Sequence, residues 1–483
     1  MERFKLALVV PNYRWIPANK NFYWHFIPYN LCILAAMVKD ICEVEIIDAY
    51  IANMSLEDFI ALLREKKPDA VGITALMDLL GPAAHMAAAQ VKAVNSDTPV
   101  IMGGVYTTVN SDYVMQDNNV DYAVTGEGEY TLRQLIGFLQ GKTPLPRQGI
   151  WYRQNGTIIS TERATFIQDM DAIPLPAYDL IDYPRYTVHV ERKSVDGPSH
   201  FPYARMMTSR GCPFNCNFCQ VDMISGRKFR PRSAEKVLDE IAFLKNRYNI
   251  QSLIFDDDNI LVNKKRAIAI FQGIIDRGLR MPWKAIAIAA FHLDHDLLRL
   301  MRESGCEYID VAIESGSQRI LKEVIGKPVN LDHAMEMVKT ARDNGIYVAT
   351  NFILGFPTET WDEIRETISF AERLGADYVK FFNALPLRHT RLWDSCVEQN
   401  VFTHDYDPMH LDWNFGPIET KDFSTLDLAI LRGYEWDRVN FTAPEKRKRT
   451  ATMMNISEEE LLQIRRDTLS NIHKAIHHKG LVA

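Results

Sequence analysis

The clearest chemical signal in the sequence is a group of three cysteines. Cys212, Cys216 and Cys219 lie within eight residues, directly after an apolar stretch that predicts a β-strand. Thiolates at this spacing on one loop can converge on a soft metal centre. A zinc knuckle or three unrelated thiols are simpler interpretations, but zinc prefers a fourth Cys or His, and none follows at a close spacing. Three protein ligands would instead leave one iron of a [4Fe–4S] cube open to bind and reduce a substrate.

The elements that must position this loop form a regular series. Six apolar stretches predict strands, and helices are predicted between them, most clearly at residues 233–247, 331–344 and 360–374. Six units are too few for a closed eight-unit barrel and favour an open, partial (β/α)6 TIM-like barrel, whose working face is the carboxyl ends of the strands. The predicted strands are residues 205–209, 253–257, 284–288, 308–313, 347–352 and 378–382.

Polar residues and turns follow several of these strands. Asp257 and Asp258 end the second strand, where they could also cap a helix or lie in a solvated turn. Glu314 ends the fourth strand, in an otherwise apolar VAIESG segment that offers few structural reasons for an acid. Asn351 and Gly355 lie at the end of the fifth, where the Gly-Phe-Pro sequence also predicts a turn before a helix.

An earlier series of strands and helices occupies residues 1–140. Strands are predicted at residues 4–10, 43–48, 70–74, 100–102 and 122–124, so this part predicts a doubly wound parallel sheet. Ligands of such sheets bind outside the carboxyl ends of the strands, and glycines there let the backbone approach a ligand closely. Tight turns before helices are the simpler interpretation. The candidate residues are Thr74, Gly103, Gly104, Gly126, Glu127, Gly128 and Glu129.

The remaining segments and the composition limit the other possibilities. Residues 141–200 are rich in proline and predict a linker with a hairpin at Asn155-Gly156. Residues 386–483 predict a mainly helical C-terminal domain, with its clearest helix at 457–478, that we expect to be a substrate-binding or cap region. The 483 residues carry a net charge of -7, which offers no global attraction for nucleic acid. No apolar run approaches the ~20 residues of a membrane span. Seven cysteines are an odd, sparse count that indicates reduced thiols and a cytoplasmic protein.

The Cys-x3-Cys-x2-Cys spacing, together with the barrel pattern, resembles the radical S-adenosylmethionine (SAM) superfamily. The resemblance implies that Cys212, Cys216 and Cys219 hold a [4Fe–4S] cluster whose open iron takes the amino and carboxylate groups of SAM. It also implies contacts to SAM from the strand ends and from the aromatic residue before the last cysteine. These SAM-binding residues would be Phe218, Asp257, Asp258, Glu314, Ser315, Asn351 and Gly355.

The N-terminal sheet in front of such a barrel resembles the cobalamin-binding group of this superfamily, a flavodoxin-like, B12-binding type of domain. The segments IIDAY (46–50), PDAVGIT (68–74), MGGVYTT (102–108) and TGEGEYT (125–131) and the later DAIPLPAYDL (171–180) carry the resemblance. The sequence departs from the cobalamin-binding pattern in one place. Residues 11–15 lack the Asp-x-His-x-x-Gly motif, whose histidine replaces the cofactor's own base. The lower face of the cobalamin would then be empty, bound by water or covered by Leu76 or Met77. A vestigial domain that contributes only substrate contacts is the alternative.

The resemblance implies an enzyme that generates a 5'-deoxyadenosyl radical and, with cobalamin, methylates an unactivated carbon or phosphorus of a small molecule. A cyclase, a dehydratase and an aminocarboxypropyl transferase are alternatives that share the same architecture. A cobalamin- or iron-dependent sensor is an alternative of another class, although no DNA-binding segment is recognisable. The expected partners are a small-molecule substrate and an electron donor such as flavodoxin or ferredoxin.

Overall fold

The computed structural model describes residues 3–19, 27–188, 194–404, 406–407 and 415–482. The chain folds as two compact units. The first consists of Met1–Arg192 with Asp222–Gly226, and the second of Lys193–Val221 with Arg227–Ala483. The predicted domain boundaries at residues 140, 200 and 385 would divide these units further, and they stay predictions.

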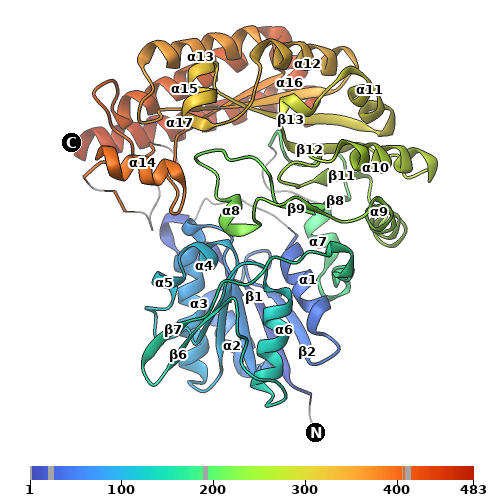
Figure 1. Ribbon diagram of the computed structural model, residues 1–483, viewed down its shortest axis with the longest axis vertical. Helices are drawn as coiled ribbons and strands as arrows, with labels where there is room; N and C mark the ends of the chain where they lie inside the picture. Colours follow the sequence, from blue (N-terminus) through green and yellow to red (C-terminus); the bar gives the residue numbers. More distant parts are fainter. Residues whose placement is uncertain (1–2, 20–26, 189–193, 405, 408–414, 483) are drawn as a thin grey trace. The chain divides into compact units, whose positions relative to one another are not determined.

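The first unit is built on a seven-stranded sheet whose first five strands are parallel, in the order β2-β1-β3-β4-β5 (Figure 1). This is the flavodoxin-like, doubly wound order, so the predicted fold of this part is confirmed. The switch point, where a ligand is expected, lies between the carboxyl ends of β1 and β3. The strands are β1 (Lys5–Val10), β2 (Glu43–Asp48), β3 (Ala70–Thr74), β4 (Val100–Gly103) and β5 (Tyr122–Val124).

The central strands of this sheet are apolar along their whole length because helices cover both faces. Every residue of β3 is buried, for example. Helix α1 packs against α6, and α2 packs against α3. The helices of this part are η1 (Tyr13–Trp15), η2 (Pro17–Asn19), α1 (Tyr29–Val38), α2 (Leu56–Lys66), η3 (Asp78–Leu80), α3 (Gly81–Val94), α4 (Val105–Val109), α5 (Ser111–Val114) and α6 (Gly128–Leu139).

The predicted hairpin at Asn155-Gly156 is present, but it extends the first sheet. Strand β6 (Ile150–Gln154) pairs antiparallel with β5, and β7 (Thr157–Ser160) pairs antiparallel with β6. Asn155 and Gly156 have φ angles of 49° and 79°, the positive values that a two-residue hairpin turn requires. Three short helices follow: η4 (Met170–Ala172), η5 (Tyr178–Leu180) and α7 (Tyr183–Thr187).

The second unit contains an all-parallel sheet of six strands in the order β15-β14-β13-β12-β11-β8. The strand order is open, with β15 and β8 at its two ends, as the predicted partial barrel requires. Its strands are β8 (Tyr203–Met206), β11 (Ser252–Phe255), β12 (Trp283–Ile288), β13 (Cys306–Glu314), β14 (Tyr347–Leu354) and β15 (Tyr378–Asn383); a separate pair is β9 (Ser209–Arg210) with β10 (Arg230–Pro231).

Helices between these strands begin at clear sequence signals. The Ser233 hydroxyl caps α9 by accepting from the Lys236 amide, and Thr360 forms a reciprocal capping box with Glu363 at the start of α13. The helices that follow the strands are α8 (Val221–Ile224), α9 (Ala234–Tyr248), α10 (Lys264–Asp276), η6 (Ala290–His292), α11 (His295–Ser304), η7 (Ile320–Ile325), α12 (Leu331–Asp343) and α13 (Trp361–Arg373).

The C-terminal region is mainly helical, as predicted, and contains helices besides the one expected at 457–478. Helices α15, α16 and α17 pack on one another, and α15 also packs on β15. Buried side chains of these helices, including Phe441 and Met454, form one apolar cluster with Tyr308 and Ala349 of the sheet. The four helices are α14 (Arg391–Gln399), α15 (Thr425–Phe441), α16 (Pro444–Met454) and α17 (Glu458–Val482). Among the described residues, no helix is long and apolar enough to cross a membrane.

Candidate active site

The cysteine-bearing loop, residues 211–219, follows β8 and β9 at the carboxyl edge of the second sheet. Two aspartates after β11 hold its beginning. Asp257 is buried and accepts hydrogen bonds from the Thr208 amide at 3.1 Å, from the Thr208 hydroxyl at 2.7 Å and from the Ser209 hydroxyl. Asp258 accepts from the Gly211 amide at 3.1 Å. Burial raises the pKa of both carboxyls. Asp258 therefore contacts the first residue of the cysteine loop, and Asp257 holds the segment directly before it.

Cys212, Cys216 and Cys219 are half-buried, whereas the other four cysteines are fully buried. Burial, with smaller effects from Cys216, Asp258 and Cys212, raises the pKa of Cys219 to about 12. Among the described residues, no three His, Cys, Asp or Glu side chains are placed to hold one metal ion. A [4Fe–4S] cube binds each thiolate through a different iron, so three half-buried thiols on one loop, near enough to influence the pKa of Cys219, fit such a cluster. Iron would supply the charge that holds them as thiolates.

Two segments distant in sequence hold the middle of the loop. The Asn217 amide donates to the carbonyl of Ile325, at the end of η7, at 2.9 Å. The first turn of α14 contributes the Leu392 amide, which donates to the Asn217 carbonyl at 2.9 Å, and the Arg391 guanidinium, which donates to the Asn215 carbonyl. The C-terminal region thus fastens the cysteine loop.

Glu314, at the end of β13, forms a buried ion pair. Its Oε1 lies 2.7 Å from Nζ of Lys327, which also donates to the Ala312 carbonyl at 2.7 Å. Glu314 has a φ angle of 78°, at an irregularity in the pairing of β13 with β14. Such a backbone is strained for a non-glycine residue and is typical of functional positions. Both side chains also influence the pKa of Cys216, so this pair lies beside the cysteine loop.

Three other predicted SAM-binding residues lie at the same edge with different surroundings. Phe218 lies near Phe356, with 6.5 Å between the ring centroids. Gly355 has a φ angle of 88°, and a Cβ there would come 2.4 Å from Cδ1 of Leu428, so the turn has no space for a side chain. The Ser315 hydroxyl is fully buried and engaged with Thr367 at 3.1 Å.

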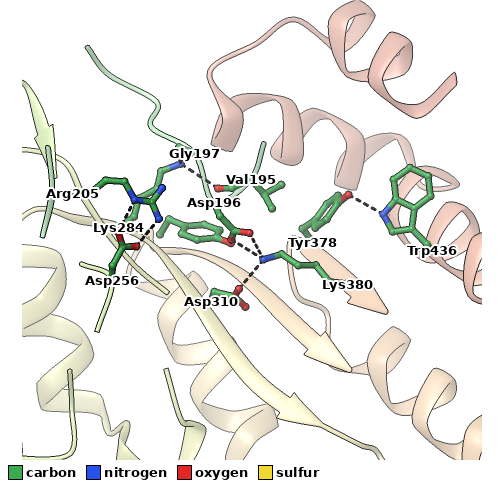
Figure 2. A network of polar contacts seen from close by, with 11 residues as sticks. Val195, Asp196, Gly197, Arg205, Asp256, Lys284, Asp310, Tyr378, Lys380 and Trp436 are labelled. Carbon is green, nitrogen blue, oxygen red and sulfur yellow. Dashed lines mark hydrogen bonds and ion pairs between the residues drawn. The ribbon is translucent and has the colours of Figure 1, made fainter. Parts of the chain in front are cut away.

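Charged side chains occupy one face of the second sheet (Figure 2). Lys380 on β15 lies 2.6 and 2.7 Å from the two oxygens of Asp196 and 2.7 Å from Asp310 on β13. Arg205 on β8 donates to both oxygens of Asp256 at 2.5 and 2.6 Å. Burial raises the pKa of Asp310 although Lys380 opposes it. Burial also acts to raise the pKa of Asp196, but Lys380, Tyr308 and Lys284 together lower it.

The same face contains two further buried polar groups. Nζ of Lys284 donates to the Gly197 carbonyl at 2.8 Å, and burial lowers the pKa of this lysine to about 8. Asn351, on β14, carries an Oδ1 that has no hydrogen-bond partner among the described residues. Composition and motif spacing did not indicate Lys284, Lys380 or Lys327. For Lys284 and Lys380, alternation with apolar residues along β12 and β15 was the available signal, whereas Lys327 lies in a loop and had none.

In the first unit, the predicted glycines lie at the carboxyl edge of the parallel strands. Gly104 has a φ angle of 95°, and a Cβ there would come 2.5 Å from the Ala75 carbonyl oxygen. Gly126 has a φ angle of 73°, and a Cβ there would meet no atom within 4 Å. Gly103 and Gly128 would make only ordinary contacts. Gly104 therefore serves close backbone packing, while the space beside Gly126 is open to a ligand.

Several other predicted residues of this edge form hydrogen bonds or are buried. Thr74 is buried, and its hydroxyl accepts a hydrogen bond from Asn30 at 3.3 Å. The Glu127 carboxylate accepts a hydrogen bond from the Ile167 amide at 2.7 Å. Glu129 is buried in the first turn of α6. Leu76 is 36% exposed, and Met77 is partly buried. An exposed apolar side chain after β3 and an open glycine after β5, at the same edge of the sheet, fit the face of a large flat ligand such as cobalamin. Residues 20–26 of the loop after β1 lie outside the described residues.

Comparison with known proteins agrees with both parts of the chain. Residues 206–371 match the Radical SAM superfamily, and residues 18–136 match the B12 binding domain. An uncharacterized methyltransferase of Pyrococcus horikoshii is 36% identical over 77% of this chain and 79% of its own length. A cytidylyl-2-hydroxyethylphosphonate methyltransferase of Streptomyces wedmorensis is 30% identical over 72% of this chain and 70% of its own length.

A solved structure shares the fold at low identity. TsrM of Kitasatospora setae, a radical SAM methyltransferase, superposes with a TM-score of 0.71 at 16% identity, over 96% of this chain and 99% of that chain. The predicted [4Fe–4S] cluster, SAM and cobalamin are the cofactors of the matched families, which confirms these expectations. This chain belongs to the cobalamin-binding family of radical SAM enzymes.

Proposed function

We propose that this enzyme is a cobalamin-dependent methyltransferase that methylates an unactivated carbon, or a phosphorus, of a polar small molecule. The observation that carries the proposal is that the two relatives above are named methyltransferases and align with most of this chain. The fold shared with TsrM is consistent with this, although at 16% identity it supports the fold alone.

For the cluster and SAM we propose roles that follow the contacts of each residue. Cys212, Cys216 and Cys219 bind the cluster, and Asp257 and Asp258 act mainly by holding their loop. Glu314, supported by Lys327, and Phe218 are the groups beside the loop that we expect to contact SAM. The contacts of Ser315 and Gly355 favour support of the strand ends over direct binding. Asn351 forms a side-chain hydrogen bond with Asp310, and we propose that it contacts SAM as predicted.

For cobalamin we propose that the first unit binds the cofactor at the carboxyl edge of its sheet. Gly126 offers open space, and Leu76 and Met77 supply an apolar surface. Thr74, Gly103, Gly104, Glu127, Gly128 and Glu129 shape the same edge. We propose further that no protein histidine lies beneath the cobalt, since residues 11–15, where the family's histidine motif would lie, contain no histidine.

The substrate class is suggested by the charged face of the second sheet. Arg205, Asp310 and Lys380 lie on β8, β13 and β15, Asp256 directly follows β11, and the cysteine loop lies at the carboxyl edge of the same sheet. Ordered, paired charges suit a molecule with hydrogen-bonding groups better than a hydrocarbon, because apolar groups would leave such charges without solvation.

When bound, the cluster with SAM supplies a 5'-deoxyadenosyl radical and cobalamin supplies the methyl group. Cleavage of SAM consumes one electron, and we propose flavodoxin or ferredoxin as its source. We also propose that the enzyme acts in the cytoplasm and without nucleic acid. The seven cysteines, none of them in a disulfide, support a reducing compartment, and the net charge of -7 disfavours nucleic acid.

The cluster assignment is tested by replacing all three cysteines with alanine. Anaerobically reconstituted wild-type protein should contain about four iron and four sulfide ions, as a [4Fe–4S] cube requires. The triple variant should contain almost none, while the variant Cys396→Ala should match the wild type. A full cube in the triple variant would overturn the assignment.

The reaction type is tested with SAM deuterated at its methyl group, in assays with candidate polar acceptors. Methyl transfer should label the acceptor and produce S-adenosylhomocysteine together with 5'-deoxyadenosine. A converted acceptor without label would instead indicate a cyclase or dehydratase, and release of 5'-methylthioadenosine would indicate aminocarboxypropyl transfer. Binding of cofactors without any turnover of SAM under reducing conditions would favour a sensor.

A further inference from the structure

The second unit contains a cavity that the proposed methyl transfer does not use. It has a volume of about 440 Å³ and lies between α12, α13, α15 and α16, next to residues 375–377, which directly precede β15. This is the amino-terminal end of the strands, whereas the cysteine loop and the predicted SAM-binding residues lie at the carboxyl ends. A ligand here would therefore be separate from the catalytic cofactors.

Four cationic side chains line this cavity, and only one of them is fully engaged. Arg438 uses Nη1 and Nη2 for Glu372, at 2.9 and 3.0 Å, and Nε for Glu435, at 2.7 Å. Arg342 and Arg449 share the buried carboxylate of Asp377, each through Nε alone, at 3.1 and 2.6 Å.

Several hydrogen-bond donors remain beside the cavity. Among the described residues, the Nη groups of Arg342 and Arg449 have no hydrogen-bond acceptor, and neither has Nζ of Lys446. Asp377 and Glu372 favour the charged form of Lys446, but burial outweighs them and lowers the pKa of this lysine to about 8, with Arg342 acting in the same direction. Burial makes this ammonium group costly to keep charged, even with Glu372, Asp377 and Glu445 in the lining, and a bound anion would offset part of that cost.

We propose that this cavity binds an anion through a phosphate group, held by the ammonium of Lys446 and the free ends of Arg342 and Arg449. Two guanidinium groups and an ammonium are the donor set that proteins use for phosphate. The ligand would connect α16 with α12. The residues Ala451, Met453 and Met454 of α16 pack in the apolar cluster that contains Tyr308 and Ala349. A bound phosphate would therefore stabilise the helical region against the sheet.

The test is titration of the full-length protein, with its cluster reconstituted, with inorganic phosphate by calorimetry and by thermal unfolding. Lys446→Gln should raise the Kd for phosphate about tenfold, the loss expected for one charge-assisted hydrogen bond. Lys446→Arg should restore binding. The matched control is Lys448→Gln, which removes the same charge from an exposed position of the same helix and should leave the Kd unchanged. Equal affinities in all four proteins, or no binding, would overturn the proposal and indicate an adventitious ion only.

The pH dependence supplies a second readout. Sulfate keeps a constant charge between about pH 6 and 9, so changes in its affinity report on the protein. Because burial lowers the pKa of Lys446 to about 8, the affinity of wild-type protein for sulfate should fall as the pH rises from 7 to 9. The charged groups that face this lysine are Asp377, Glu372, Glu445, Arg342, Arg438 and Arg449. Lys446→Arg should show no such fall, and an identical fall in that variant would contradict the assignment.

Discussion

At the scale of single residues, Glu359 controls the turn that ends β14. Its Oε2 accepts from the amides of Gly355 and Phe356, at 2.6 and 3.1 Å, while Oε1 has no hydrogen-bond partner among the described residues. The side chain is fully buried, and burial raises its pKa to about 7. The turn therefore needs an acceptor at this position more than it needs a charge.

We expect Glu359→Gln to fold like the wild type, because the amide oxygen can accept both hydrogen bonds. Glu359→Ala should lose about 1–3 kcal/mol for each amide left without an acceptor. A carboxyl group with a raised pKa in the folded state stabilises the protein most below its unfolded pKa, and this stability is lost as the pH rises towards 7. Urea unfolding at pH 5 and 7.5 should show this decline in wild-type protein but not in Glu359→Gln. An equal decline in both proteins would contradict the assignment.

Gly126 and Gly141 form a matched pair for testing the cobalamin site. Their φ angles are 73° and 72°, and a Cβ at either position would meet no atom within 4 Å. Valine at either site should therefore cost a similar amount of stability, about 1–2 kcal/mol for the left-handed backbone. Only Gly126 lies at the carboxyl edge of the sheet, so only Gly126→Val should weaken the binding of hydroxocobalamin, measured by absorbance. Equal binding by both variants would place the cofactor elsewhere.

At the scale of elements, α14 fastens the cysteine loop through Arg391 and the Leu392 amide. Arg391→Gln should accelerate the loss of iron to a chelator several-fold, since a charge-assisted hydrogen bond is worth about 1.5–3 kcal/mol. It should also change the paramagnetic resonance spectrum of the reduced cluster, which a purely structural role would not do. Arg365→Gln, in an exposed pair on α13, is the control. Unchanged iron loss in Arg391→Gln would show that the contact does not position the loop.

Most elements of both sheets could be predicted from the sequence because their patterns are local. Strands β2, β3 and β5 have the predicted limits, since β3 and β5 are apolar runs and β2 combines apolar with acidic residues in a short segment between turns. Helices α15 and α16 were not predicted. Helix α15 contacts β15, α13, α16 and α17, so it has no single apolar stripe. The capping box of Ser424 and Asp427 was a local signal of its start.

In the candidate site, too, the local features could be predicted from the sequence and the long-range contacts could not. The spacing of the three cysteines lies within one loop and could be read directly from the sequence. The partners of that loop could not, because Arg391 and Asn215 are 176 residues apart and meet only through the tertiary fold. Lys327 illustrates the same limit, since nothing in its own segment indicates a buried ion pair with Glu314.

At the scale of the whole molecule, the residues proposed for the two metal cofactors belong to different compact units. The cysteine loop lies in the second unit, and Gly126 with the other glycine-bearing strand ends lies in the first. Each unit has a sheet of its own, and the core of the first consists of its own side chains. A ligand stabilises the folded state that binds it, so each cofactor should depend on the unit that supplies its binding residues.

We therefore expect the two cofactors to be lost independently. The variant with Cys212, Cys216 and Cys219 replaced by alanine should contain almost no iron but bind hydroxocobalamin with the affinity of wild-type protein. Gly126→Val should show the reverse, with full iron and sulfide and little cobalt, because its side chain blocks only the space at the first sheet. Iron, sulfide and cobalt measured on the same preparations test this. If either variant lost both cofactors while its circular dichroism stayed native, binding at the two sites would be energetically coupled, and the assignment of each cofactor to its own unit would fail.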